Sequence, residues 1–212
     1  SDVYPLKIIK NKNSTKFFVK VKEQKIDLDV KDINISNLLA SLAVLKDLNL
    51  NLNATKKTFK NYEPTEGRGK THLISRYNKK FKLLDESYNA NPLSVKNAII
   101  NFDSIKKKKF KKYLILGDML ELGRKSEMYH KDLSKVINNT DIDKVFIKGE
   151  KTLFTYKYLN KSKRGNILQN KDDIDFILSN IIVNKDYLMI KGSNATGLNT
   201  ISKKMIKGLN VI

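Results

Sequence analysis

Three polar segments of this sequence combine residue types that can bind a polar or anionic ligand. Residues 85–92 read Asp-Glu-Ser-Tyr-Asn-Ala-Asn-Pro, and such carboxylates, amides and phenol can hydrogen-bond a ribose, a base edge or a phosphate-linked water. Residues 117–123 read Gly-Asp-Met-Leu-Glu-Leu-Gly, whose two carboxylates can hold Mg²⁺ through water or anchor an ammonium group. Residues 191–197 read Lys-Gly-Ser-Asn-Ala-Thr-Gly, and their backbone N–H groups, lysine and hydroxyls suit a phosphate or a carboxylate.

Each of these segments also has an ordinary structural explanation. The first can be a capped turn between a strand and a helix, because Pro92 suits the first turn of a helix. The second can be a solvated loop. The third is not a P-loop, since the order Gly-x-x-x-x-Gly-Lys-Ser/Thr is absent. Taken singly, the segments leave both explanations open.

Each polar segment follows an apolar run of strand length. Near-continuous apolar runs at 81–84, 113–116, 145–147 and 187–190 are typical of strands buried on both faces, and the intervals between them carry helical periodicity. This alternation predicts an α/β fold, a Rossmann-like and mostly parallel sheet with helices on both faces. In such sheets ligands bind at the carboxyl ends of the strands, where the three polar segments begin.

The first part of the chain has a different pattern. Alternating apolar runs at 6–9, 17–21 and 26–30 predict an antiparallel β-meander. A helix follows over 38–45, with Ser36 or Asn37 as its cap, and then a short helix over 54–59. Pro64 and the Gly67-Arg68-Gly69 triplet interrupt both periodicities. We therefore expect two domains, residues 1–66 and 67–212.

Composition excludes several classes of protein. The 212 residues are 40% hydrophobic, which suffices for a buried core, and no apolar run reaches the length of a membrane span. The chain has no cysteine, so disulfides and thiolate sites are excluded, and with only two histidines we do not expect a histidine-built zinc site. Without a signal-peptide pattern or a membrane insertion, we expect a cytoplasmic protein.

The charge is strongly positive, with 42 Lys and Arg against 22 Asp and Glu, but it does not require a nucleic-acid partner. Arginine occurs only at four positions, and the lysines are spread along the chain as in sequences biased toward Lys, Asn and Ile. The densest lysine run, residues 106–112, fits a solvated helix end. A protein that recognises RNA or single-stranded nucleic acid usually has several aromatic residues among its lysines, on which the bases stack, and this run has only Phe110.

In their order along the chain, Gly67-Arg68 and the segments 85–92, 116–123 and 191–193 resemble the Mur ligase family. The strings at 88–92 and 117–123 resemble the members that add D-Ala-D-Ala to UDP-MurNAc-tripeptide, and the likeness extends upstream to residues 34–40. The resemblance implies an ATP-dependent amide ligase of peptidoglycan precursor synthesis, which activates the tripeptide carboxylate as an acyl phosphate. It also implies ATP and Mg²⁺ as cofactors and those two peptides as substrates.

The resemblance assigns residues to two sides of the reaction. Asn37 matches the family's adenine-contacting Asn, Arg68 its inter-domain Arg that reaches ATP, and Glu86 the usual ribose-binding Asp. The remaining matches on the nucleotide side are Tyr88, Asn89 and Asn91, and those on the substrate side are Asp118, Glu121, Lys191 and Ser193. His130 matches a family histidine, which we expect to be structural.

The family's P-loop and its carbamylated, Mg²⁺-supporting lysine have no match here and would lie before Ser1. Residues 1–66 would then be the C-terminal remnant of the central ATPase domain, and residues 67–212 the family's C-terminal domain. No catalytic residue or metal ligand is assigned in this chain. We expect it to be a monomer that is inactive alone and binds ATP weakly or not at all. The alternatives are another Mur or folylpolyglutamate-type ligase, or a non-catalytic basic module that binds nucleotides or nucleic acid.

Overall fold

The computed structural model describes residues 2–11, 14–31, 33–106, 109–170 and 172–208. The chain divides into two compact units, Ser1–Pro64 and Thr65–Ile212, which we call the N-terminal and C-terminal units. The division lies beside the expected boundary before Gly67, and the assignment of these units to domains of a longer enzyme stays a prediction. Two lysines of the 106–112 run, at positions 107 and 108, lie outside the described residues.

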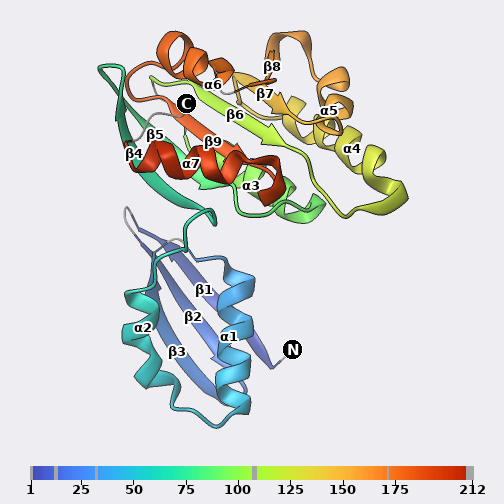
Figure 1. The fold of residues 1–212 in the computed structure, drawn as a ribbon. Helices are drawn as coiled ribbons and strands as arrows, with labels where there is room; N and C mark the ends of the chain where they lie inside the picture. Colours follow the sequence, from blue (N-terminus) through green and yellow to red (C-terminus); the bar gives the residue numbers. More distant parts are fainter. Residues whose placement is uncertain (1, 12–13, 32, 107–108, 171, 209–212) are drawn as a thin grey trace. The chain divides into compact units, whose positions relative to one another are not determined.

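The N-terminal unit is the expected meander followed by helices (Figure 1). Strands β1 (Val3–Lys10), β2 (Thr15–Val21) and β3 (Gln24–Val30) form an antiparallel sheet in chain order. Helix α1 (Ile35–Asp47), the 3₁₀ turn η1 (Leu52–Thr55) and helix α2 (Lys56–Lys60) follow. The cap of α1 is Asn34, whose side chain accepts the N–H groups of Ser36 and Asn37, so the prediction of Ser36 or Asn37 as the cap is wrong.

The core of this unit follows from its alternating pattern. Inward side chains of β2 and β3 pack against the apolar side of α1 and η1. The buried members are Phe17, Val19, Val21, Ile26, Leu28, Val30, Leu38, Leu42 and Leu52. Strand β1 lies at the edge of the sheet and leaves most of its residues exposed.

The C-terminal unit contains a six-stranded sheet in the order β4-β5-β9-β6-β7-β8. Its strands are β4 (Lys70–Arg76), β5 (Lys79–Glu86), β6 (Lys112–Gly117), β7 (Lys144–Lys148), β8 (Arg164–Ile167) and β9 (Tyr187–Lys191). The β4–β5 pair is antiparallel, and every other neighbouring pair is parallel. The predicted mostly parallel sheet is therefore confirmed. The two outer strands, β4 and β8, were missed because neither carries a continuous apolar run.

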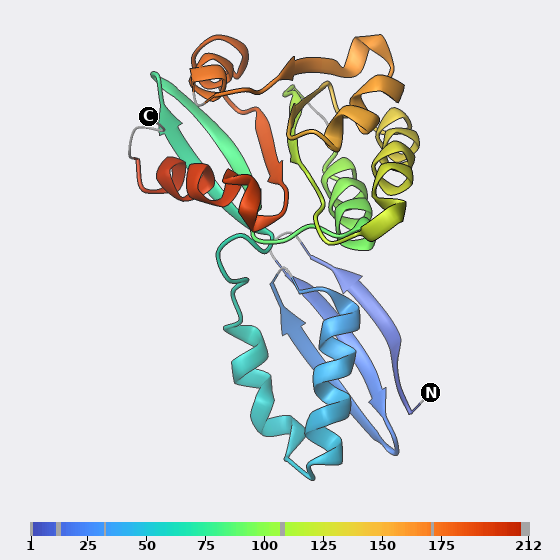
Figure 2. The same ribbon diagram turned by 45° about the vertical axis from the view of Figure 1, so that its right-hand side comes forward.

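Helices cover both faces of this sheet, as predicted. On one face α3 (Pro92–Asp103), α4 (Ser126–Asn138) and α5 (Thr152–Tyr158) enclose one apolar cluster. On the other face α6 (Asp172–Phe176), the π-helical turn η4 (Ile177–Ile181) and α7 (Leu198–Ile206) enclose a second. Figures 1 and 2 show α7 and α3 on opposite sides of the strands. Among the described residues, none of the helices is long and apolar enough to cross a membrane.

Three short 3₁₀ turns complete the unit: η2 (Gly123–Lys125), η3 (Lys161–Lys163) and η5 (Asn194–Thr196). The connection from β5 through α3 to β6 passes over β9, which enters the sheet last in the chain and lies between them. The central strands of the sheet thus come from distant parts of the sequence, and their carboxyl ends lie next to one another.

Candidate functional site

The three polar segments meet at one edge of the C-terminal sheet. In register, Lys191 at the end of β9 pairs with Glu86 of β5 on one side and with Leu116 of β6 on the other. The loops that follow these strands therefore start side by side (Figure 2). We call residues 86–91, 117–121 and 191–197 the edge loops.

Two glycines bring the loops after β6 and β9 into backbone contact. A Cβ added at Gly117 would lie 2.7 Å from Leu198 Cδ1 and 3.3 Å from the Gly192 Cα, and one added at Gly192 would lie 3.0 Å from the Gly117 Cα. These positions require glycine because a side chain at either one would push the two loops apart.

Asp85 ties the Gly67 turn to the loop after β5. Its carboxylate is buried and accepts the Gly67 N–H at 3.0 Å on one oxygen and the Ser87 hydroxyl at 2.6 Å on the other. The sequence placed Asp85 in a polar segment suited to a ligand, but its role as an anchor between two loops was not predicted. The available signal was that position 85 continues the inward alternation of Phe81 and Leu83 along β5, so its carboxylate had to be buried and satisfied.

Arg68 and Tyr88 form an exposed pair above this anchor. The Arg68 guanidinium carbon lies 4.4 Å from the centre of the Tyr88 ring, and Tyr88 is 45% exposed. The Tyr88 N–H donates to the Gly67 carbonyl at 3.1 Å, and Gly67 has φ +76° with no room for a Cβ beside Tyr88. The structure thus brings together two of the residues assigned to the nucleotide side, with a cation and a flat ring facing solvent.

Glu86 is paired with Lys191 at the root of the same loop. The Lys191 Nζ lies 3.5 Å from Glu86 Oε2, with side chains 3% and 25% exposed. Burial raises the pKa of Glu86, against the opposing effect of the Lys191 charge. Burial likewise lowers the pKa of Lys191, against the effect of Glu86. The carboxylate is the more accessible partner and can accept a hydroxyl from a ligand.

The two asparagines of the first loop use their side chains locally. The Asn91 side-chain oxygen accepts the Ser94 N–H at 2.8 Å, and the Ser94 hydroxyl accepts the Asn91 N–H at 3.0 Å, which forms a capping box at the start of α3. The Asn89 side-chain oxygen accepts the Ala90 N–H at 2.8 Å. The structural alternative for this segment, a capped turn into a helix that begins at Pro92, is therefore also present.

Asp118 caps a helix rather than facing open solvent. Its carboxylate accepts the Thr152 N–H at 2.8 Å and the Lys151 N–H at 3.2 Å, both at the start of α5. Gly149 has φ +122°, and a Cβ there would overlap the Asp118 carboxylate. Asp118 therefore fixes the loop after β6 to the loop after β7.

Ser193 joins all three edge loops. Its hydroxyl accepts the Leu120 N–H at 3.1 Å and donates to the Ala90 carbonyl at 3.4 Å, and its own N–H donates to the Asp118 carbonyl at 3.0 Å. Ser193 is buried, so these bonds are made out of water. Glu121, in contrast, is exposed with φ +61°, and within the described residues no hydrogen bond joins it to this cluster.

His130 holds the loop after β6 through a hydrogen bond to its backbone. It is fully buried, its Nε2 accepts the Met119 N–H at 3.0 Å, and its Nδ1 lies 2.8 Å from the Ser126 carbonyl, so Nδ1 carries the proton. Burial is the leading cause that lowers the pKa of His130. The expectation that this histidine is structural agrees with its contacts.

Asn37 belongs to the N-terminal unit. It lies exposed in the first turn of α1, where its N–H donates to Asn34 at 3.3 Å. Its assignment to the adenine side stays a prediction.

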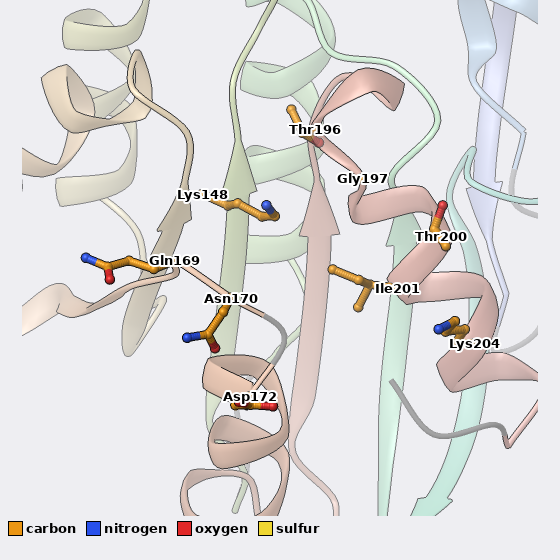
Figure 3. Close-up of a pocket in the computed structure, with 9 residues that line it drawn as sticks. All are labelled: Lys148, Gln169, Asn170, Asp172, Thr196, Gly197, Thr200, Ile201 and Lys204. Carbon is orange, nitrogen blue, oxygen red and sulfur yellow. The ribbon is translucent and has the colours of Figure 1, made fainter. Parts of the chain in front are cut away.

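A pocket opens beside the edge loops, between the end of β7 and the start of α7. Its volume is about 630 Å³. In Figure 3, Lys148 reaches from β7 toward α7, and Ile201 reaches from α7 into the same space. The residues that line it are Lys148, Gln169, Asn170, Asp172, Thr196, Gly197, Thr200, Ile201 and Lys204. The Lys148 ammonium, the Thr200 hydroxyl and the apolar side chain of Ile201 suit a small molecule with a carboxylate and methyl groups.

No group of three or more His, Cys, Asp or Glu side chains that could hold a metal ion is found in the ranges that the structure describes. The carboxylates of the site act as helix caps, loop anchors and a lysine partner. These residues therefore do not fit a Mg²⁺ site.

Comparison with known proteins places this arrangement in a family. A family model described as "Mur ligase, glutamate ligase domain" matches residues 67–194. A UDP-N-acetylmuramoyl-tripeptide--D-alanyl-D-alanine ligase of Buchnera aphidicola is 31% identical over 176 residues, which are 82% of this chain and 36% of that protein. The enzyme of the same name from Bacillus subtilis is 33% identical over 129 residues, which are 59% of this chain and 28% of that protein.

The fold agrees with a solved structure. The crystal structure of MurF ligase from Thermotoga maritima in complex with ADP superposes with a TM-score of 0.77 at 18% identity, and the match covers 97% of this chain and 46% of that one. At this identity the likeness shows the fold. The chain spans about a third of the length of the curated relatives that it matches.

Proposed function

The chain belongs to the Mur ligase family, and from this we propose that it forms the C-terminal part of an ATP-dependent ligase that joins D-Ala-D-Ala to UDP-MurNAc-tripeptide. One observation carries the proposal. The edge loops converge into one hydrogen-bonded cluster in a chain whose 31% identical relative bears the name of that ligase. We further propose that the protein works as a monomer in the cytoplasm in peptidoglycan precursor synthesis.

The nucleotide would be bound at the Arg68–Tyr88 pair. The exposed Arg68 guanidinium offers several donors to phosphate oxygens, and the partly exposed Glu86 carboxylate can accept a ribose hydroxyl. The assignment of Asn37 to the adenine side is an expectation from the family resemblance alone. These side chains fit a nucleoside triphosphate, which when bound supplies the phosphoryl group that activates the tripeptide carboxylate. The chain's own part is to bind and orient the nucleotide.

The incoming dipeptide would bind on the other side of the edge loops, in the pocket of Figure 3. Lys148 and the hydroxyl of Thr200 suit its carboxylate, and Ile201 suits an alanine methyl group. Holding the amine of the dipeptide in a fixed position beside the activated carboxylate lowers the barrier by orientation alone. Mg²⁺ has no ligand set among the described residues, and we assign no step of this chain to it.

The test of this proposal is an NMR titration of the ¹⁵N-labelled chain with D-alanyl-D-alanine. We expect saturable shifts confined to Lys148, residues 191–197 and the start of α7, because the pocket borders these amides. L-alanyl-L-alanine is the matched control, since it differs only in chirality, and it should cause at most weak shifts. Equal responses to the two dipeptides, or shifts spread over the surface lysines, would count against the proposal.

A second titration with Mg·ADP tests the nucleotide side. We expect shifts at Arg68, Tyr88 and Glu86 at high ligand concentration, because this chain alone offers only part of a nucleotide site. Arg68→Ala should abolish them, and Arg124→Ala, which removes an exposed arginine of η2, should not. A dissociation constant in the low micromolar range would contradict the expectation of weak binding.

A further inference from the structure

The ammonium group of Lys191 is engaged by two hydrogen bonds and one ion pair within its own chain. A lysine ammonium carries three protons. The Lys191 Nζ donates to the Asn89 carbonyl at 2.5 Å and to the Glu86 carbonyl at 3.3 Å, and lies 3.5 Å from Glu86 Oε2. Three acceptors, all within the first edge loop, thus surround a side chain that is 3% exposed. Direct contact with a substrate would require one of these bonds to break.

The position of Lys191 in the sheet explains this arrangement. Lys191 ends the strand that lies between β5 and β6, so its side chain leaves the sheet where the first edge loop turns away. The loop presents two carbonyl oxygens and one carboxylate toward it. A buried charge is tolerated only when it is paired and hydrogen-bonded, and here the pairing holds the backbone of residues 86–89 in one conformation.

Ser193, two residues further on, makes the corresponding bonds to the other loop. It binds Leu120 and Asp118, and it also reaches the Ala90 carbonyl. Lys191 and Ser193 therefore connect the loop that carries Glu86 and Tyr88 to the loop that borders the pocket. Together these two connections join the three edge loops.

We propose that Lys191 is a positioning residue: it fixes the loop that carries Glu86 and Tyr88, and it touches neither nucleotide nor dipeptide. This deepens, and rests on, the proposed ligase function, and it changes the role that the family resemblance gave Lys191 on the substrate side. The Lys191 ammonium group thereby connects the loop that carries the nucleotide contacts to the loop that borders the dipeptide pocket.

Amide hydrogen exchange on the full chain tests the proposal. Lys191→Met keeps the side-chain length but removes the charge and all three donors. We expect the amides of Ser87 and Tyr88 to exchange about tenfold faster or more, because their loop loses its main connection to β9. Lys191→Arg keeps the cation and should restore part of the protection. Lys135→Met, which removes an exposed lysine paired with Asp132, should change nothing in this loop.

The titration of Glu86 adds a measurement that general loss of stability would not change. Without Lys191, Arg68 is the remaining cation that acts on this carboxyl, so its pKa should rise in Lys191→Met and return toward the native value in Lys191→Arg. Carbon-13 NMR of the Glu86 carboxyl follows it. Unchanged exchange and an unchanged Glu86 titration in Lys191→Met would overturn the proposal.

If the variants do not fold, the wild-type chain still decides the question. In protein labelled with ¹⁵N at lysine Nζ, the Lys191 ammonium should exchange its protons far more slowly than Lys135, and D-alanyl-D-alanine should leave its signal unmoved. Fast exchange, or a saturable shift with the dipeptide, would overturn the proposal. Because the amide and Glu86 measurements use no ligand, a failure of nucleotide or dipeptide binding would count against the ligase function alone.

Discussion

A lysine is buried at both ends of the strands in the C-terminal sheet, at the amino ends (the amino edge) and at the carboxyl ends (the carboxyl edge), but the two lysines have different surroundings. At the amino edge, Lys112 is fully buried and its Nζ donates to the Asp103 carbonyl at 2.6 Å, which closes the end of α3 onto β6. At the carboxyl edge, Lys191 holds a loop whose neighbours Arg68 and Tyr88 are exposed. A buried charge by itself is therefore no sign of function. A candidate site is indicated by a buried charged side chain that holds a loop whose other polar side chains remain accessible to solvent.

Asp85 and Asp186 repeat this contrast. Asp186 is buried at the amino edge, where its carboxylate accepts the N–H of Val183, three residues earlier, and the N–H of Lys111, 75 residues earlier. Asp85 is equally buried at the carboxyl edge, where it joins the Gly67 turn, 18 residues earlier, to Ser87. Both aspartates therefore fasten separate segments, and the difference lies in their surroundings, since the exposed Arg68 and Tyr88 directly follow Gly67 and Ser87 at the carboxyl edge.

The largest effect is expected at Gly149, where the carboxyl edge is most tightly built. Gly149→Ala should lower the free energy of unfolding by roughly 3 kcal/mol, because the new Cβ overlaps the Asp118 carboxylate and the residue has φ +122°. Urea denaturation measures this. Gly123→Ala is the control, since Gly123 also has positive φ but nothing lies within 4 Å of an added Cβ, and it should cost about 1 kcal/mol. Equal costs would mean that the overlap is relieved without loss.

Lys112→Met separates the two edges directly. Loss of the buried donor leaves the Asp103 carbonyl without this partner, and we expect unfolding to become easier by about 2 kcal/mol. Amide exchange at Ser87 and Tyr88 should nevertheless stay at the wild-type rate relative to global unfolding, in contrast to Lys191→Met. If Lys112→Met loosened the first edge loop as much as Lys191→Met, the proposed difference between the edges would be lost.

Asn91→Ala tests how much the loop depends on its helix cap. Removing the capping box at the start of α3 should cost about 1 kcal/mol in thermal or urea unfolding. Asn101→Ala, on the exposed side of the same helix, should cost much less. A shift of the Mg·ADP-responsive signals in Asn91→Ala larger than this stability change accounts for would indicate that Asn91 also contacts the nucleotide.

The smallest effect concerns pH. Burial lowers the folded-state pKa of His130 below the ordinary value of a histidine, so the unfolded chain binds the proton more readily. This part of the stability is fully present above the unfolded pKa and is lost as pH falls below it, with a slope of at most about 1.4 kcal/mol per pH unit. His72, whose pKa burial also lowers, acts in the same direction. Urea unfolding between pH 7.5 and 5.5 should show a weaker pH dependence in His130→Gln than in wild type, and a wild-type curve that is flat over this range would contradict the assignment.

Apolar periodicity predicted most of the fold. The four central strands and most of the helices lie where the runs and the helical spacing predicted them, because burial on both faces of a parallel sheet demands continuous apolar residues. The strands β4 and β8 were missed because edge strands contact the core on fewer sides and need no such run. The cap of α1 was misplaced by two or three residues, since Asn34, Ser36 and Asn37 all have side chains suited to a cap and only the backbone geometry decides which one is used.

The candidate site was predictable in its place but not in its connections. The parallel topology fixes the loops after β5, β6 and β9 at one edge, and their residue types suit polar ligands. The anchoring role of Asp85 was missed because a buried carboxylate resembles any other acidic residue until its partners, Gly67 and Ser87, are known. The positioning role of Lys191 could not be predicted from the sequence either, since its acceptors, Glu86 and Asn89, lie about a hundred residues earlier in the chain.

The sequence by itself determined the α/β architecture, the convergence of the three polar segments at the carboxyl ends of the strands, and the family, because these follow from periodicity, strand order and local strings of residues. Only the tertiary structure decided which polar side chains face solvent and which hold the loops together. Arg68 and Tyr88 remain accessible to solvent. In contrast, the side chains of Asp85, Asp118, Lys191 and Ser193 form hydrogen bonds with other segments of the fold. The physical reason is that a hydrogen bond between distant segments depends on how those segments are packed, which no local pattern records.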